Sequence, residues 1–319
     1  MPRASIVMPA YNAERYVAQA IESVQSQTMP EFELIAINDG STDGTLAILE
    51  GFARGDARIK VYSQPNRGFA ESLHRGFELA ENDWIFRMDA DDRMHPNRLE
   101  RQLAFLEEHP EVAVASSLVC HIDARNRVIG RDNSRLFTHE SIEELLARNE
   151  PIGFCHSAVV LRKSAVMAAG GYRKQFWPAE DIDLWTRMAE QGYKMLVQPE
   201  YLLDYRIHGS SATVAGARAT RVKVRWLKDC MMRRRAGKPE LELDAFIAAE
   251  HARPLLARLN QERKDLAKVF YKAAVYHYAQ RQYARLSVKL LAAFLLQPGY
   301  VAAQVSTKGA IGRGAGAVQ

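Results

Sequence analysis

Short apolar runs alternate with amphipathic stretches through the first 120 residues, and this alternation limits the possible folds more than any other feature. Apolar runs of strand length lie at residues 5–9, 32–37, 59–62, 84–88 and 112–119. Helical spacing of apolar side chains marks the stretches between them, at residues 13–27, 45–52, 69–80 and 97–108. Strands and helices that alternate across short links predict βαβ units. We therefore predict an α/β protein whose Rossmann-like, mainly parallel sheet has helices on both faces.

Size and composition place the chain among ordinary globular proteins. Of its 319 residues, 47% are apolar and 25% are charged, which allows a large core. The three cysteines lie far apart and form no CxxC motif, which argues against a disulfide framework and against a cysteine zinc site. The sequence shows no secretory signal and no run of ~20 apolar residues that could span a membrane. We expect a cytoplasmic location.

The pattern changes near residue 211, from mixed strands and helices to helices alone. Before this point, strands are predicted at 157–161 and 202–207, with a helix at 182–190. After it, helices are predicted at residues 217–235, 241–260, 262–281 and 283–296. We predict a main domain at 1–212, with halves at about 1–120 and 121–212, then an all-helical C-terminal extension at 213–305 and a disordered tail at 306–319.

Two aspartates follow the apolar run at residues 84–88. Side chains alternate along a strand, so Asp89 and Asp91 are expected on the same side. Two carboxylates there repel each other unless a cation lies beside them, and Mg²⁺ or Mn²⁺ takes oxygen ligands and bridges carboxylates to phosphates. The alternative is a solvated acidic turn that caps the helix beginning near Pro96.

Polar residues follow three of the predicted strands, at Tyr11-Asn12, at Asp39 and at Asp89. In open α/β sheets ligands bind outside the carboxyl ends of the strands, so this rim predicts a nucleotide site. Asp39 can instead belong to a turn, with residues 41–43 capping the next helix. Arg67 can hold a phosphate through paired N–H donors or lie free on the surface. Neither a GxGxxG nor a GxxxxGK[ST] motif accompanies the rim.

Glu180 and Asp181 precede an amphipathic helix and are candidates for a general base. They can also serve as capping residues, and the helix dipole favours the ionised carboxylate in either role. His208 is a candidate ligand for a metal or a phosphate, although a single histidine often has a structural role. Trp177, beside the acidic pair, is either a core residue or a platform on which a sugar ring stacks.

These residues belong to a series of motifs in a fixed order: MPAYN at 8–12, NDGSTDGT at 38–45, MDADD at 88–92, GGY at 170–172, ED with LW and Arg187 at 180–187, and YRIHG at 205–209. From about residue 5 to 211 the chain resembles the inverting glycosyltransferases of family 2, which have the GT-A fold. Each motif alone is weak evidence, but the ordered set is highly specific. Two departures are Asn38, where the family often has aspartate, and His74, where related sequences often have asparagine.

The resemblance implies a nucleotide-sugar donor, usually linked to uridine diphosphate, and a divalent cofactor, Mn²⁺ or Mg²⁺. It implies that residues 1–120 bind the nucleotide, that residues 121–212 bind the acceptor, and that Asp181 is the general base with Glu180 beside it. Asp91 and Asp89 match the DxD motif that holds the metal and ribose, and His208 is a further metal candidate. The donor-binding residues implied or inferred are Pro9, Ala10, Tyr11, Asn12, Asp39, Arg67 and Asp89.

A basic stretch at 218–238 and the rival functions complete the predictions. Nine Lys or Arg residues and a single acid, Asp229, lie in this stretch, which predicts contact with anionic lipid at the cytoplasmic face of the inner membrane. Bacterial enzymes that resemble this chain build surface polysaccharide on glycan or lipid-linked acceptors.

Two alternative functions are considered. The first is a nucleotidyltransferase, which needs a glycine-rich basic loop that is absent here. The second is a catalytically silent nucleotide-sugar-binding or scaffold module recruited through the helical tail. Nucleic-acid binding is not expected, because no base-reading motif is present.

Overall fold

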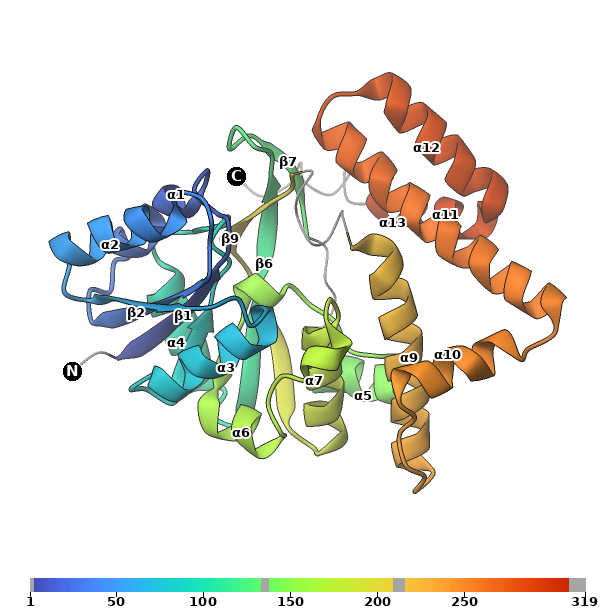
Figure 1. Cartoon of the computed structure of the whole chain (residues 1–319), viewed down its shortest axis with the longest axis horizontal. Coiled ribbons are helices and arrows are strands. Elements are labelled where there is room, and N and C mark those ends of the chain that lie inside the picture. Colours follow the sequence, from blue (N-terminus) through green and yellow to red (C-terminus); the bar gives the residue numbers. More distant parts are fainter. Residues whose placement is uncertain (1–2, 133–137, 209–215, 310–319) are drawn as a thin grey trace.

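The structure, a computed structural model, describes residues 3–132, 138–208 and 216–309. Within them, nine strands form one sheet in the order β3-β2-β1-β4-β8-β6-β9-β5, with β7 paired to β6 (Figure 1). The strands are β1 (Ala4–Ala10), β2 (Phe32–Asp39), β3 (Ile59–Gln64), β4 (Trp84–Arg87), β5 (Arg93–Met94), β6 (Val112–Ile122), β7 (Val128–Arg131), β8 (Val160–Arg162) and β9 (Lys194–Arg206). The predicted α/β class is confirmed.

The first four strands run parallel, as the βαβ pattern predicts. β1 pairs in parallel with both β2 and β4, and β2 pairs in parallel with β3. In the second half β6 is parallel to β9, whereas β5, β7 and β8 pair antiparallel with their neighbours. β1 and β2 are buried along their whole length, which explains why they read as continuous apolar runs and not as alternating ones.

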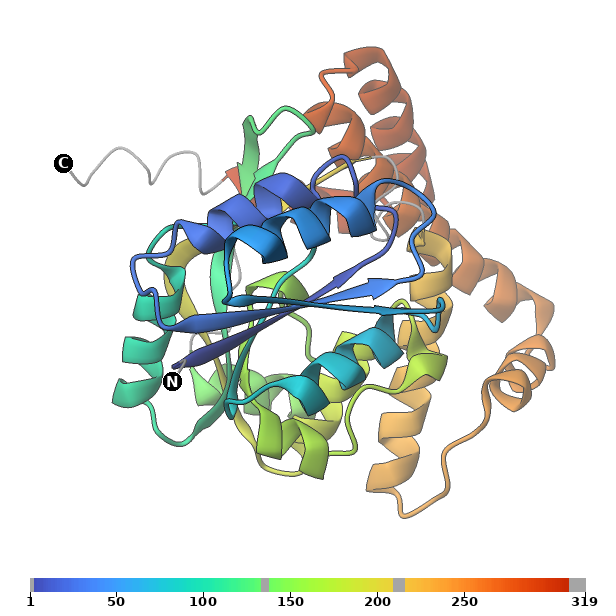
Figure 2. The ribbon, with the colours of Figure 1, turned by 60° about the vertical axis from the view of Figure 1, so that its left-hand side comes forward.

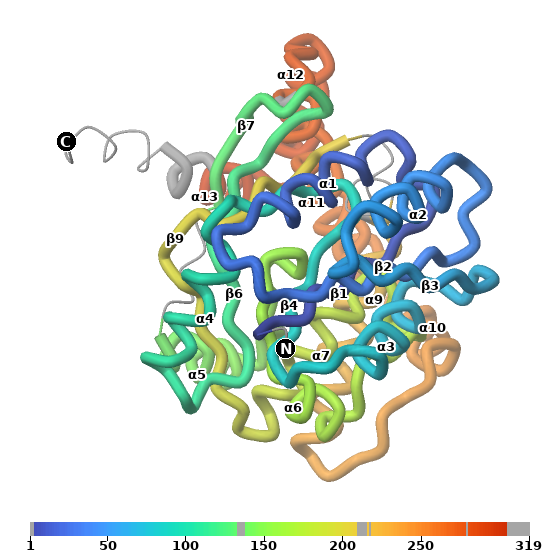
Figure 3. The backbone as a smooth tube through the Cα atoms, turned by 90° about the vertical axis from the view of Figure 1, so that its left-hand side faces the viewer, coloured from blue at the N-terminus to red at the C-terminus, as the bar shows by residue number. Residues whose placement is uncertain are grey.

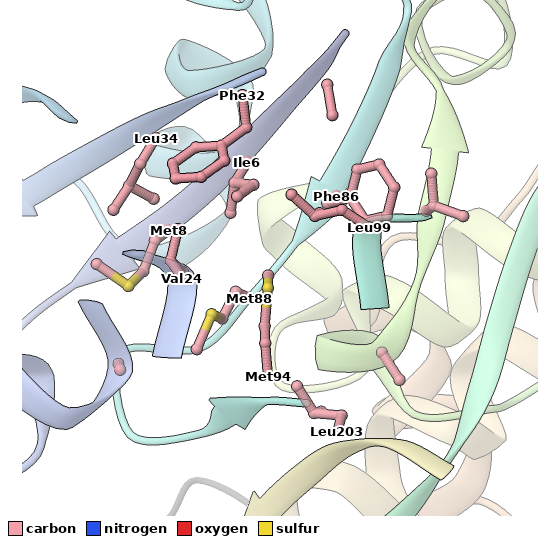
Figure 4. Packing of buried hydrophobic residues seen from close by; sticks show 14 of the residues in the cluster. Ile6, Met8, Val24, Phe32, Leu34, Phe86, Met88, Met94, Leu99 and Leu203 are labelled. Atoms are coloured by element: carbon pink, nitrogen blue, oxygen red, sulfur yellow. The ribbon is translucent and has the colours of Figure 1, made fainter. Parts of the chain in front are cut away.

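Helices cover both faces of the sheet (Figures 2 and 3). Alternate residues of β1 divide the core: Ile6 and Met8 join one cluster and Val7 joins the other. The first cluster, part of which is drawn in Figure 4, includes residues of α1 (Val17–Gln25), α2 (Thr45–Gly55) and α4 (Arg98–Glu108). The second includes residues of α3 (Phe69–Leu79), α5 (His139–Ala147), α6 (Lys163–Ala168) and α7 (Glu180–Glu190). The first three strand–helix pairs lie close to their predicted positions.

The second half of the main domain departs from its predicted elements. The strand predicted at 157–161 is divided into a 3₁₀ turn, His156–Ala158, and the short strand β8. β9 begins at Lys194, eight residues before the predicted strand at 202–207. A second 3₁₀ turn, Lys174–Phe176, precedes α7. α5, α6 and the short strands β5 and β7 were not predicted, because they are too short or too polar to give a clear period.

The C-terminal part is helical, as predicted, and consists of α9 (Ala217–Arg235), α10 (Leu243–His251), α11 (Leu255–Ala279), α12 (Tyr283–Leu296) and α13 (Pro298–Gly309). α9 packs on α7, and α11 and α12 form a hairpin that packs on α9 through α11 (Figure 1). The helix predicted at 241–260 is wrong: Pro254 separates α10 from α11, because proline removes a backbone donor and disfavours helix in the residue before it.

The predicted limits of the C-terminal extension are only partly covered. Residues 306–309, assigned from the sequence to a disordered tail, belong to α13, and residues 310–319 lie outside the described part of the chain. The predicted boundary near 212 also lies outside it, as does Gly209 of the YRIHG motif.

Cys120, Cys155 and Cys230 are free thiols. Among the described residues, no helix is long and apolar enough to cross a bilayer.

Candidate active site

The loop after β1 is fastened to the loop after β2. Asn12 has a positive φ of 49°, and its side-chain oxygen accepts a hydrogen bond from the Thr42 backbone N–H at 2.8 Å. The Asn12 backbone N–H donates to the Ser41 hydroxyl at 3.1 Å, and the Ala13 N–H donates to the Thr45 hydroxyl at 2.8 Å. These bonds hold the end of β1, with Pro9, Ala10 and Tyr11, beside the end of β2.

Asp39, at the end of β2, is 4% exposed and holds a neighbouring turn. Its carboxylate accepts hydrogen bonds from the backbone N–H groups of Arg67 and Gly68, both at 2.9 Å, and from the Gln64 amide at 2.8 Å. A carboxylate has about four acceptor positions, so one remains for a ligand. Asp43, and not Asp39, binds the first N–H of α2 at Thr45. The structural and ligand-binding roles considered for Asp39 can therefore coexist.

The acidic cluster forms in a turn and not along a strand. β4 ends at Arg87, and Asp89, Asp91 and Asp92 follow it with carboxylate oxygens within 4.8 Å of one another. The turn, not the alternation of a strand, brings Asp89 and Asp91 together, so the predicted reason was wrong although the predicted neighbours were right. Asp92 was not predicted, and its carboxylate accepts the Arg206 backbone N–H at 2.8 Å.

Two basic side chains, Arg87 and His208, lie against this cluster. Arg87, which is 2% exposed, forms an ion pair with Asp89 at 2.5 Å. His208, after the end of β9, places Nε2 2.8 Å from Asp91 Oδ2, next to the Tyr16 ring. The sequence predicted His208 as a ligand but missed Arg87, because a buried arginine inside a strand has no motif of its own.

Burial sets the electrostatics of the acidic turn. It raises the pKa of Asp89, which Arg87 opposes and Asp91 reinforces. It also raises the pKa of Asp92 well above its usual range, and the carboxylates of Asp91 and Asp89 add to this effect. Asp92 Oδ2 is buried without a hydrogen-bond partner among the described residues. A set of crowded carboxylate oxygens with an unused acceptor fits a hard divalent cation such as Mn²⁺ or Mg²⁺.

Glu180 and Asp181 are the first two residues of α7. Glu180 is 5% exposed and its Oε2 has no partner among the described residues, whereas Asp181 is half-buried and accepts the Ile182 backbone N–H at 2.8 Å. Burial raises the pKa of Glu180 to about 8, with a contribution from the Asp181 charge, and raises that of Asp181 to about 6. The helix dipole favours the ionised carboxylate, but at Glu180 the cost of desolvation outweighs this effect and raises the pKa.

An ion-pair network fixes the start of α7. Asp183, fully buried, binds Arg173 through both oxygens, at 2.9 and 2.5 Å, and also accepts from Arg187 Nε at 2.9 Å. Arg187 donates to the Gly171 carbonyl at 2.5 Å. Gly170 and Gly171 have positive φ values of 86° and 62°, which glycine adopts without strain. The GGY motif and Arg187 thus form one unit that orients Glu180 and Asp181.

Two cavities meet at the acidic turn. The first cavity has a volume of about 1190 Å³ and is lined by Asp91, His208 and every predicted donor-binding residue. These donor-binding residues are Pro9, Ala10, Tyr11, Asn12, Asp39, Arg67 and Asp89. The second, about 600 Å³, is lined by Glu180 and Asp181 together with Arg87. Asp89, Asp91 and Trp177 line both cavities. Trp177 is 49% exposed, which excludes the core alternative for this residue.

The basic stretch 218–238 is mostly engaged within the chain. Arg225 pairs with Glu250 and Asp265, and Arg234 pairs with Glu190 and Glu240. Lys228, Arg233 and Arg235 also pair with carboxylates. Acids from α7, α9, α10, α11 and nearby loops therefore already pair with these five residues, which reduces the charge that the stretch could offer to an anionic membrane.

Comparison with known proteins agrees with this geometry. The sequence model described as glycosyl transferase family 2 matches residues 5–167, about half of the chain. The chain belongs to glycosyl transferase family 2. It is similar to EpsE of Bacillus subtilis, named as a glycosyltransferase, with 37% identity over 197 residues that cover 60% of this chain and 69% of that protein.

Further family members and solved structures are similar in sequence or in fold. The amylovoran biosynthesis glycosyltransferase AmsE of Erwinia amylovora is 29% identical over 205 residues, which cover 63% of this chain and 75% of that protein. S. aureus TarS 1–349 in complex with UDP-GlcNAc has a TM-score of 0.57 at 15% identity and covers 93% of this chain and 92% of that chain. The mannosyltransferase PcManGT of Pyrobaculum calidifontis, with GDP-Man and Mn²⁺, has a TM-score of 0.53 at 17% identity, covering 97% and 80%. These likenesses establish the GT-A fold for this family 2 glycosyltransferase.

Proposed function

We propose that this glycosyltransferase moves a sugar from a nucleotide-diphosphate donor to a hydroxyl group of an acceptor, with inversion at the anomeric carbon. The supporting observation is that two cavities share Asp89 and Asp91, with the nucleotide-side residues in one and Asp181 in the other. A donor whose diphosphate lies at the acidic turn would have its sugar directed toward the second cavity. An acceptor in the second cavity would then lie on the side opposite to the leaving group, as inversion requires.

The first cavity is the proposed donor site. Asp39 has one acceptor position left for a base N–H, and the exposed Tyr11 ring offers a face for stacking. Arg67 lines the same cavity and offers paired donors to a phosphate. Two of the structurally similar proteins were solved with UDP-GlcNAc and GDP-Man, which supports a nucleotide sugar in general. We propose a uridine diphosphate sugar, because Asp39 would accept the N3–H of uracil.

Asp91 and Asp89, with His208 as a further candidate, are the residues that would hold Mn²⁺ or Mg²⁺. A divalent cation there supplies positive charge that stabilises the diphosphate leaving group. The PcManGT structure contains Mn²⁺, in agreement with this assignment. The ion pair with Arg87 holds Asp89 in position. Arg87 does not line the first cavity, so we assign it the role of positioning the acidic turn and not of contacting the donor there.

Asp181 is the proposed general base. Its carboxylate takes the proton of the acceptor hydroxyl while that oxygen forms a bond to the anomeric carbon and the bond to the diphosphate breaks. A pKa of about 6 leaves Asp181 ionised at neutral pH and still basic enough to accept a proton. Glu180, with a pKa of about 8 and little exposure, is mainly protonated at the same pH. We assign it the role of orienting its neighbour.

We further propose that the acceptor is a glycan or a lipid-linked sugar of surface polysaccharide synthesis, since AmsE is named for the biosynthesis of amylovoran. Peripheral contact with the cytoplasmic face of the inner membrane belongs to this proposal. Because five of the nine cations in 218–238 are paired with carboxylates, the proposed membrane contact relies on exposed apolar side chains of α12 near the exposed Arg285 in sequence. These side chains are Val288, Leu291, Phe294 and Leu295. Sedimentation with vesicles that contain phosphatidylglycerol, compared with vesicles of phosphatidylcholine alone, tests this contact.

We also propose that the chain is divided into a catalytic domain at residues 1–212 and a helical extension at residues 213–305.

Calorimetry with UDP, UDP-GlcNAc and GDP-Man, with and without Mn²⁺, tests the donor site. We expect Mn²⁺-dependent binding of a uridine nucleotide that is lost in Asp91→Ala and kept in Asp181→Asn. A ligand at 100 times its Kd should stabilise the protein by ~2.7 kcal/mol. Binding without transfer or donor hydrolysis would favour the silent nucleotide-sugar-binding module, and no nucleotide binding would overturn the proposal.

A further inference from the structure

The second cavity is completed by the helical extension. Besides Glu180 and Asp181 of α7, its lining includes Thr220 of α9 and Lys272 of α11. α11 packs against α9, which in turn packs against α7 (Figure 1), and residues of all three helices line this cavity. Residues distant in the sequence thus contribute a hydroxyl and an ammonium group to the space that the acceptor would occupy.

Lys272 has no ion-pair partner within the described part of the chain, although it is half-buried. Arg221, one residue after Thr220, also lacks an ion pair among the described residues, and the same holds for Lys268, one turn before Lys272. Burial and, to a smaller extent, the Arg221 charge lower the pKa of Lys272 to about 8, while the Asp181 charge opposes the shift. Burial and the Arg221 charge also lower the pKa of Lys268.

Several other cations of α9 have partners within the chain. Arg225, Lys228 and Arg234 pair with carboxylates, and Lys223 donates a hydrogen bond to the Gln175 carbonyl. Arg221, Lys268 and Lys272 have no ion-pair partner among the described residues, although the Asp181 carboxylate acts on Lys272 from across the cavity lining. Half-buried cations of this kind are costly unless a further anion binds beside them. The Lys272 ammonium is a suitable donor for an oxyanion, and the Thr220 hydroxyl, which donates to the Gly216 carbonyl at 2.9 Å, lines the same space.

We propose that Lys272, with Thr220 beside it in the cavity lining and the Arg221 charge nearby, forms a subsite for an oxyanion on the acceptor, a phosphate or a carboxylate near the hydroxyl that is glycosylated. The inference rests on the proposed function, because it takes the second cavity as the acceptor site. The extension would then select negatively charged acceptors over neutral ones, in addition to packing on the main domain. Lys272 acts here as a specificity-determining residue.

Binding of three small probes to the full-length protein tests the subsite: glucose 1-phosphate, methyl glucuronide and methyl glucoside, with and without UDP and Mn²⁺. The wild type should bind the two anionic probes about tenfold more tightly than the neutral one, a preference of the size expected for a charge-assisted hydrogen bond. Lys272→Gln should remove the preference and Lys272→Arg should retain it. Lys264→Gln, on the same helix but outside the cavity lining, is the matched control.

Binding of the small probes tests the oxyanion subsite, and binding of UDP tests the proposed donor site, so the two proposals can fail separately. Loss of the anionic preference in Lys272→Gln with unchanged UDP–Mn²⁺ binding supports the subsite, and a preference for only one anionic probe identifies its source as phosphate or carboxylate. Equal binding of charged and neutral probes by the wild type would overturn the subsite while leaving the donor site intact. An unchanged preference in Lys272→Gln, together with a shifted pH profile of transfer, would instead make Lys272 a group that only tunes Asp181. Failure of UDP to bind, with the anionic preference kept, would overturn the proposed donor site and leave an oxyanion site at Lys272 whose role as an acceptor subsite no longer follows.

Discussion

Glu180 shows how one buried carboxylate can weaken the fold. Its pKa is about 8 in the folded protein against 4.5 when exposed, so between these values the folded state holds a proton that the unfolded state releases. Its contribution therefore makes the protein less stable as the pH rises from 4.5 to about 8. Glu180→Gln removes this penalty, and we expect it to raise the free energy of unfolding at pH 7.5 by roughly 1–3 kcal/mol, falling to about zero near pH 4.5.

Urea unfolding at pH 7.5 and at pH 5 measures this difference. The matched control is Glu144→Gln, because Glu144 pairs with Arg148 on an exposed helix face where both side chains are about two-thirds exposed. We expect that change to stay within about 0.5 kcal/mol at either pH. A Glu180→Gln protein that is less stable than the wild type at pH 7.5 would show that the carboxylate has a partner worth more than its desolvation cost.

Asp181 carries the pH dependence of the proposed reaction. With a pKa of about 6, its carboxylate gains a proton as the pH falls below that value and can no longer accept one from the acceptor. We expect kcat/KM to fall about tenfold per pH unit below about pH 6, and Asp181→Asn to lower kcat by about 10²–10⁴-fold with donor affinity kept. A pH–rate profile under initial-rate conditions measures both. An acidic limb that persists unchanged in the residual activity of Asp181→Asn would assign the titration to another group.

At the scale of single residues, the motifs predicted which side chains gather at the rim but not their environment. Asp39, Asp89 and Asp181 could be identified because they lie in ordered motifs at strand or helix ends. Arg87 and the raised pKa of Glu180 could not, since both depend on burial by segments far away in the sequence. Desolvation is a property of the packed site, and no local pattern contains it.

At the scale of elements, α3 packs on β1 through a glycine. A Cβ on Gly76 would lie 2.3 Å from Cγ1 of Val7, so Gly76→Ala must push α3 off the sheet. We expect a loss of about 1–3 kcal/mol, because overpacking a close contact strains both elements. Gly51 is the control: it lies in α2, and the nearest atom to a Cβ there is 3.8 Å away on a flexible arginine. Gly51→Ala should raise stability by about 0.5–1 kcal/mol, and thermal unfolding of the two variants should move in opposite directions.

Elements were predictable where the sequence gives a clear period or a terminator. α9 and α12 have their predicted bounds, and the ends of β1 to β4 differ from prediction by at most two residues. The break at Pro254 had a readable signal, since proline is disfavoured inside a helix, and the prediction at 241–260 passed over it. β5 has only two residues and pairs with β9 from far away in the chain, so no local pattern could predict it.

At the scale of the whole molecule, the helical extension supports the segment that leads to the proposed base. A small core of Phe176, Trp226, Leu227, Cys230 and Phe246 joins the 3₁₀ turn before α7 to α9 and α10. The Phe176 and Trp226 rings are stacked at 4.1 Å, and Trp226 donates a hydrogen bond to the Leu241 carbonyl at 2.7 Å. Phe176 lies directly before Trp177, so the position of Trp177 and Asp181 depends on a contact with the extension.

This dependence predicts that Trp226→Ala lowers stability and activity together. Removing the indole should cost about 3–5 kcal/mol and free the Phe176 side chain from its stack. We therefore expect kcat to fall by at least tenfold at temperatures where the variant is fully folded, because Asp181 loses its position. Trp226→Phe keeps a ring against Phe176 and should retain most of kcat, while Phe294→Ala, on an exposed face of α12, should change neither property. Full kcat in a folded but destabilised Trp226→Ala would show that the extension stabilises the molecule without positioning the site.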